Sequence, residues 1–209
     1  MDFDLGEMEM NERYKIPSIY QKMHKKGYTS IDNYLWLNEM RWIPVDKILG
    51  YQHDEGESES ILPFAITGGG DKWVWIIDEE NEEYSVGLCE RGEFNGIYYA
   101  ENTENAIIRQ IIEFVSDSNF YLSEAKAKTY QISEYELKQI LQKWRNSFTG
   151  ILNERYLNII DYLSGLSLKH VKSPYGEWDA LLSVDESHEM LDKYISFDLL
   201  DEEFEWYIE

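Results

Sequence analysis

A run of glycines followed by an acidic and a basic residue is the first pattern in this sequence that could carry chemistry. Residues 68–70 are all glycine and precede Asp71 and Lys72, and the backbone amides of glycine-rich loops can hold phosphate groups. A phosphate-binding P-loop, however, has a Lys-Ser/Thr pair that opens a helix, and the helix N-terminus faces the anion. Here Lys72 is followed by Trp73 and a run of strand-forming residues. We therefore interpret these residues as a tight turn in which Asp71 caps backbone amides.

The chain has one cysteine and four histidines, which leaves few nucleophiles and metal ligands. Cys89 has no second cysteine with which to form a disulfide, so a reducing compartment fits best. The spacings His-x-x-x-His and Cys-x-x-Cys, which would indicate a zinc site, do not occur. Cys89 follows an apolar stretch at residues 86–88, so we expect a small buried side chain rather than a catalytic nucleophile. The sequence predicts neither a cofactor nor a metal.

Carboxylates are far more abundant. The 209 residues include 41 Asp and Glu against 19 Lys and Arg, a formal net charge of −22. Paired carboxylates act as general acids and bases only in a cleft that separates their pKa values. The excess acid lies in segments typical of turns and chain ends, namely the N-terminal arm and residues 54–59, 79–83 and 198–209. Such runs are typical of solvated surface, so we predict no catalytic residue and no enzymatic activity.

The same negative charge restricts the possible partners. Proteins that bind DNA or RNA through phosphates need a basic face, and anionic membrane leaflets attract polybasic segments. A chain with a net charge of −22 is repelled by both, so we expect neither nucleic acid nor membrane as a partner. The charge favours a basic protein, which would associate quickly through electrostatic steering.

Acidic segments and tryptophans are the candidates for contact with that partner. Aromatic residues surrounded by acid suit a basic protein surface, because the aromatic group anchors the interface while the charges steer from its rim. An alternative is that the tryptophans only cover the helical part of the chain, since tryptophan is enriched in both settings. The partner-binding candidates are Trp36, Trp42, Glu55, Glu57, Glu59, Glu202, Glu203 and Trp206.

The elements that position these residues follow from hydrophobic periodicity. The apolar runs at residues 61–66 and 73–77 flank the glycine turn and predict a β-hairpin. Both faces of its second strand are apolar, which predicts a central strand that is covered on each side. Further strand character is predicted at residues 35–37, near Trp42, and at residues 84–88, 97–100 and 178–184.

Helices are predicted from apolar residues at helical spacing. Ser133 and Glu136 form a capping box that marks the start of one of them. The predicted helical segments are residues 17–26, 45–50, 103–117, 133–150, 153–164 and 190–195. The chain is 43% hydrophobic, which together with its length predicts one folded core with an elaboration rather than a disordered acidic tail. It has no bilayer-spanning apolar stretch and no signal-peptide pattern, so we expect a cytoplasmic protein.

Residues 61–78 also carry a resemblance to a known family. An apolar strand ending in Leu-Pro-Phe-Ala, a Gly-Gly-Gly-Asp turn and a second strand of large apolar residues resemble the SUKH superfamily, named partly for the fungal Smi/Knr cell-wall-synthesis regulators. Residues 16–23 look like the early Leu-Pro-x-x-Tyr helix of that family, and the helix at residues 107–115 resembles its closing helix. The motif residues, to which we assign a structural role in the hairpin, are Leu62, Pro63, Phe64, Ala65, Gly68, Gly69, Gly70, Asp71 and Trp73.

The resemblance implies both a fold and a function. It covers about the first 120 residues and implies an α+β fold in which a mixed or antiparallel sheet is flanked by helices. We accordingly predict a SUKH-like core over residues 1–120 and a C-terminal α+β extension, packed on that core, over residues 121–209. Bacterial members resemble immunity proteins that bind and neutralise a cognate polymorphic toxin. The expectation is thus a non-enzymatic bacterial immunity protein. The alternative is a scaffold or regulatory interaction protein of the Smi/Knr type without a toxin partner.

Overall fold

The computed structural model describes residues 14–78, 83–117, 120–123, 128–174 and 176–207. The predicted N-terminal arm and most of the acidic segment at residues 79–83 lie outside these residues. The chain forms two compact units: Met1–Leu35, Met40–Thr103 and Leu199–Glu209 make up the first, and Trp36–Glu39 and Glu104–Asp198 the second. These units are defined by mutual contact among their residues and not by independent folding, so they do not test the predicted boundary at residue 120, which stays a prediction. The fold is α+β, as predicted, and every strand pair among the described residues is antiparallel.

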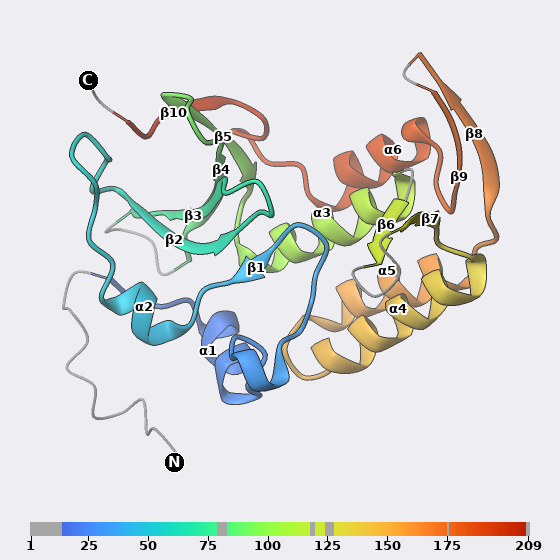
Figure 1. Ribbon diagram of the computed structural model, residues 1–209, viewed down its shortest axis with the longest axis horizontal. Helices are drawn as coiled ribbons and strands as arrows, with labels where there is room; N and C mark the ends of the chain where they lie inside the picture. Colours follow the sequence, from blue (N-terminus) through green and yellow to red (C-terminus); the bar gives the residue numbers. More distant parts are fainter. Residues whose placement is uncertain (1–13, 79–82, 118–119, 124–127, 175, 208–209) are drawn as a thin grey trace. The chain divides into compact units, whose positions relative to one another are not determined.

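A six-stranded sheet organises the first unit (Figure 1). Its strand order is β1-β2-β3-β4-β5-β10. The strands are β1 (Arg41–Trp42), β2 (Ile61–Ile66), β3 (Lys72–Ile76), β4 (Ser85–Cys89), β5 (Asn95–Ala100) and β10 (Glu203–Glu205). The predicted hairpin is confirmed as β2 and β3, and β3 lies inside the sheet with its middle residues buried. Strand β10 was not predicted, because three residues of alternating acid and phenylalanine carry too short a pattern.

The glycine turn between β2 and β3 is a hydrogen-bonded reversal, as predicted. Gly70 has a φ of +96°, a left-handed conformation that glycine adopts without steric cost. Asp71 accepts a hydrogen bond from the backbone N–H of Arg91 at 3.0 Å and one from the Thr67 hydroxyl at 2.7 Å. These two donors hold the pKa of Asp71 below its ordinary value. The Asp71 carboxylate therefore ties the β2–β3 turn to the turn that follows β4.

Aromatic rings on β2, β3 and a helix pack together in the core of the first unit. Phe64 on β2 stacks on Trp75 of β3 with ring centroids 4.7 Å apart, and Tyr20 of helix α1 (Ser18–Lys25) meets Trp75 edge-on at 5.1 Å. Offset and edge-to-face pairs of this kind add stability beyond the buried area. The second helix of this unit, α2 (Val45–Leu49), also matches its predicted position. The strand predicted at residues 35–37 is wrong: Leu35 and Leu37 are buried, but no strand forms there.

The second unit contains four helices and two small hairpins among its described residues. The helices are α3 (Thr103–Ser116, whose first residue belongs to the first unit), α4 (Glu134–Phe148), α5 (Glu154–Gly165) and α6 (Val184–Tyr194). The hairpins pair β6 (Phe120–Ser123) with β7 (Lys128–Gln131) and β8 (Lys169–Ser173) with β9 (Gly176–Ala180). The predicted capping box of α4 is confirmed. Within the described residues, no helix is long and apolar enough to cross a membrane.

Candidate functional site

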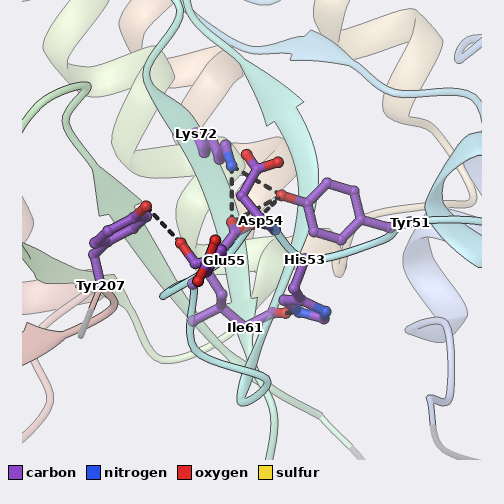
Figure 2. Close-up of polar contacts among 8 residues, drawn as sticks. Tyr51, His53, Asp54, Glu55, Ile61, Lys72 and Tyr207 are labelled. Carbon is purple, nitrogen blue, oxygen red and sulfur yellow. Dashed lines mark hydrogen bonds and ion pairs between the residues drawn. The ribbon is translucent and has the colours of Figure 1, made fainter. Parts of the chain in front are cut away.

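A buried ion pair holds the loop between α2 and the sheet in place. Lys72 Nζ on β3 lies 2.8 Å from Glu57 Oε1, and the Tyr51 hydroxyl donates to the same carboxylate at 2.7 Å (Figure 2). The backbone N–H of Asp54 donates to it at 3.0 Å, and Lys72 also donates to the Tyr51 oxygen at 2.8 Å. The Glu57 side chain has no exposed surface, whereas that of Lys72 is 24% exposed. We call Glu57, Lys72 and Tyr51 the Glu57 cluster.

The electrostatics of this cluster favour an ionised Glu57 and a protonated Tyr51. Burial alone would raise the pKa of Glu57, but hydrogen bonds from Lys72, Tyr51 and the Asp54 amide more than offset this effect and lower it. Burial and the adjacent Glu57 carboxylate raise the pKa of Tyr51 far above its ordinary value. Neither group exchanges a proton near neutral pH, so the arrangement suits charge compensation rather than acid–base chemistry. The prediction that Glu57 is a solvated loop acid is wrong, because a tertiary cation lies beside it.

The Glu57 cluster also receives the C-terminal tail, which we define as residues 203–207. Lys72 Nζ lies 5.5 Å from the centroid of the Trp206 ring, a cation–π contact. The Trp206 carbonyl accepts a hydrogen bond from Ser58 at 2.9 Å. The Tyr207 hydroxyl donates to the Glu55 carbonyl at 2.5 Å, as Figure 2 shows. The Trp206 ring packs in one cluster with three buried side chains from the sheet: Ile61, Val74 and Cys89. The loop and the tail are thereby fixed to each other.

Strand β10 pairs with β5 and completes an acidic groove on one face of the sheet. In the strand register Leu88 of β4 lies opposite Ile97 of β5, and Ile97 lies opposite Glu203 of β10. A groove of about 400 Å³ is lined by Leu88, Glu90, Glu93, Phe94, Asn95, Ile97 and Glu203. We call these residues the acidic groove. Phe94 is 49% exposed at its rim.

Three carboxylates of the acidic groove are available to a cationic partner. Glu90, Glu93 and Glu203 are exposed, and no lysine or arginine in the described part of the chain forms an ion pair with them. Glu203 accepts a hydrogen bond from the Asn95 amide at 2.8 Å, which orients its carboxylate. Half-buried Leu88 and Ile97 supply apolar surface between these charges. Carboxylates around apolar surface suit a lysine or arginine, whose aliphatic stem and charged head need both.

The predicted acidic contact residues lie in different surroundings. Glu203 lines the acidic groove, and Glu202 is exposed next to it. Glu55 and Glu59 are exposed on the loop and do not line the groove, whereas Glu57 is buried.

The three tryptophans predicted to contact a partner are buried or half-buried. Trp42 and Trp206 expose only 3% and 6% of their surface, so neither offers a face to a partner. Trp36 is half-buried, and its ring centroid lies 5.4 Å from that of Trp144 and 5.6 Å from that of Phe114. Packing against helix residues matches the alternative interpretation, in which the tryptophans cover the helical part of the chain.

Sequence reasoning missed most of the acidic groove. Glu90, Glu93 and Phe94 lie in or beside the turn between β4 and β5, and none of them was a candidate. A signal was present, since an aromatic residue among acids was the criterion applied to the tail and residues 90–94 also meet it. That Glu203 lines the same groove as this turn depends on the register of β10, which the spacing of residues does not reveal.

The one cysteine of the chain, Cys89, is poorly placed to act as a nucleophile. Cys89 is fully buried, as predicted, and burial raises the pKa of its thiol well above the ordinary range. A thiol in that state is a poor nucleophile, because the thiolate is the reactive form. Among the described residues, no three His, Cys, Asp or Glu side chains are arranged to hold a metal ion.

Three comparisons with known proteins were negative. The chain matches no protein-family model, no curated protein and no solved structure.

Proposed function

We propose that this protein is a non-enzymatic cytoplasmic binding protein of the bacterial immunity type, which neutralises a cognate toxin by covering a basic surface of it. The observation that supports the proposal best is the acidic groove, where three exposed carboxylates surround apolar side chains beside a half-exposed phenylalanine. An aromatic anchor with a charged rim is the composition typical of protein-binding surfaces. The SUKH resemblance supplies the toxin as the class of partner.

Charge and burial support the same proposal. A net charge of −22 accelerates the approach of a basic protein over long range. The acidic groove then supplies the short-range contacts, because a lysine or arginine that enters it exchanges water for carboxylates and buries its stem. The buried thiol of Cys89 and the compensated carboxylate of Glu57 support a binding role rather than a catalytic one.

The direct test is binding to any toxin domain that a neighbouring gene encodes, measured by calorimetry and by survival on co-expression. The groove variant carries Glu90→Gln, Glu93→Gln and Glu203→Gln. The matched control variant carries Glu189→Gln, Asp192→Asn and Asp198→Asn, which remove the same charge from exposed positions in the second unit. We expect the groove variant to bind at least about tenfold more weakly and to lose protection, while the control variant associates somewhat more slowly and still protects.

Three results would contradict the proposal. Equal weakening by both variants would show that only net charge matters and that the groove is not the site. Survival that does not depend on the protein would remove the immunity function. A single stable partner recovered from cells without a toxin gene would favour the regulatory role of the Smi/Knr type instead.

A further inference from the structure

Strand β10 is an open edge of the six-stranded sheet. It is the last strand in the order and pairs only with β5 (Figure 1). Tyr98 N donates to Glu202 O at 2.8 Å, and Trp206 N donates to Phe94 O at 3.1 Å. In the ladder the even-numbered residues from Glu202 to Trp206 therefore face β5, although the Trp206 carbonyl bonds Ser58 instead. In an antiparallel ladder the residues between them direct theirs away.

The outward backbone groups of β10 belong to Glu203 and Glu205. Both residues are exposed, and no described segment pairs with them on this edge. The loop pairs with the tail just beyond them, where Glu57 bridges to Tyr207 and the Ser58 N–H bonds the Trp206 carbonyl. Unpaired N–H and C=O groups at a sheet edge are a template for another strand. Side chains alternate between the two faces of a strand, so Glu203 and Glu205 project toward the face that carries the acidic groove. One short strand thus offers backbone pairing and carboxylates together.

We infer that the acidic groove binds an extended segment of its partner, which adds to β10 as a further strand. This segment carries Lys or Arg at alternate positions. The inference rests on the proposed function. A strand paired with Glu203 and Glu205 directs every second side chain to the groove face, where opposite charges across a strand pair attract. The basic residues would therefore lie beside the groove carboxylates, and the residues between them would face the opposite side of the sheet.

Charge argues against a second copy of this chain as the occupant of the edge. Two β10 strands in a symmetric pair would bring Glu203 and Glu205 of one chain against the same residues of the other. Like charges directly opposite each other destabilise a strand pair, and charged side chains at a sheet edge are a common protection against self-association. A basic strand reverses the sign of this interaction.

The test uses the full chain and a synthetic peptide of alternating lysine and valine. Glu205→Pro removes the outward N–H, which β5 does not use, and proline is tolerated at sheet edges. Glu205→Gln removes the same charge and keeps that N–H. We expect Glu205→Pro to bind the peptide about tenfold more weakly than Glu205→Gln. Equal affinities of the two variants would overturn the inference.

Measurements on the unaltered protein keep the test independent of how the proline variant folds. The peptide should protect the amides of Glu203 and Glu205 from hydrogen exchange. A peptide with the same sequence but N-methyl groups at alternate residues should bind more weakly, since it keeps the charge and loses the backbone donors. Absence of amide protection, or equal binding of the N-methylated peptide, would overturn the inference.

The two proposals fail in distinguishable ways. If the groove variant loses the peptide while Glu205→Pro and Glu205→Gln bind equally, the acidic groove stands as the binding site and strand addition is wrong. If neither the groove variant nor Glu205→Pro differs from the unaltered protein, both proposals are wrong.

Discussion

Lys72 and Trp206 are far apart in the sequence, yet the Lys72 ammonium lies 5.5 Å from the centroid of the Trp206 ring. Lys72 belongs to a strand inside the sheet, and Trp206 follows the edge strand at the chain's end. The same ammonium binds the buried carboxylate of Glu57. One lysine therefore couples the loop, the sheet and the part of the tail that directly follows β10.

The first prediction concerns the stability that the buried ion pair contributes. Glu57→Gln leaves the Lys72 ammonium without its anion, and we expect a loss of about 2–3 kcal/mol in the free energy of unfolding, below the range for fully buried pairs because Lys72 is partly exposed. Urea unfolding measures this change. Glu55→Gln is the matched control on the same loop, because the Glu55 side chain is exposed and only its carbonyl binds Tyr207. Equal stability of the two variants would contradict the prediction.

The second prediction concerns pH. The folded-state pKa of Glu57 is lowered, whereas the unfolded chain has the ordinary value of about 4.3. Ionised Glu57 therefore contributes stability that is fully present above the unfolded-state pKa and is lost as pH falls through the folded-state pKa. We expect the stability difference between the unaltered protein and Glu57→Gln to be constant from about pH 7 to pH 5 and to shrink at lower pH. A difference that stays constant in acid would show that Glu57 is not ionised in the folded protein.

The third prediction separates the ring of Trp206 from its N–H. The indole N–H is buried and has no hydrogen-bond partner among the described residues. Trp206→Phe keeps an aromatic face for Lys72 and loses no hydrogen bond, so we expect a cost of about 1 kcal/mol. Trp206→Ala removes the ring that packs on Ile61 and Cys89, and we expect about 3 kcal/mol. Thermal or urea unfolding compares the two. Similar losses for the two variants would contradict the prediction.

The fourth prediction concerns the close approach of β10 to the sheet. A Cβ at Gly87 would lie 2.6 Å from ring atoms of Phe204, so Gly87→Ala should displace Phe204 and cost about 1–3 kcal/mol. In the background of Phe204→Ala the clash with the ring is absent and only Ile76 Cδ1, 3.2 Å from the new Cβ, must yield, so adding Gly87→Ala should cost less than in the unaltered protein. A double-mutant cycle measures this coupling. Gly165→Ala is the control, because a Cβ there meets nothing within 4 Å. Additive effects of the Gly87 and Phe204 substitutions would contradict the prediction.

Local patterns predicted the elements that carry their own signal. Helices with a clear apolar stripe, the capping box at Ser133 and the hairpin around Gly70 depend on residues within a few positions of one another. The strand predicted at residues 35–37 failed because an apolar run there is buried by an irregular loop, and burial alone does not specify a strand. Strand β10 was missed for the opposite reason, since its three residues, two of them exposed, form a strand only because β5 lies beside them.

The amino-acid sequence by itself determined the negative net charge of the chain, the α+β class and the turn that Asp71 caps, since each follows from composition or from neighbouring residues. Only the tertiary structure decided which acids are available. Glu57 and Glu203 both lie in acidic segments, yet a lysine from another strand neutralises Glu57 while the edge position of β10 leaves Glu203 exposed. The physical reason is that the solvation and pairing of a charge depend on residues distant in the chain, whose proximity is set by strand register and core packing.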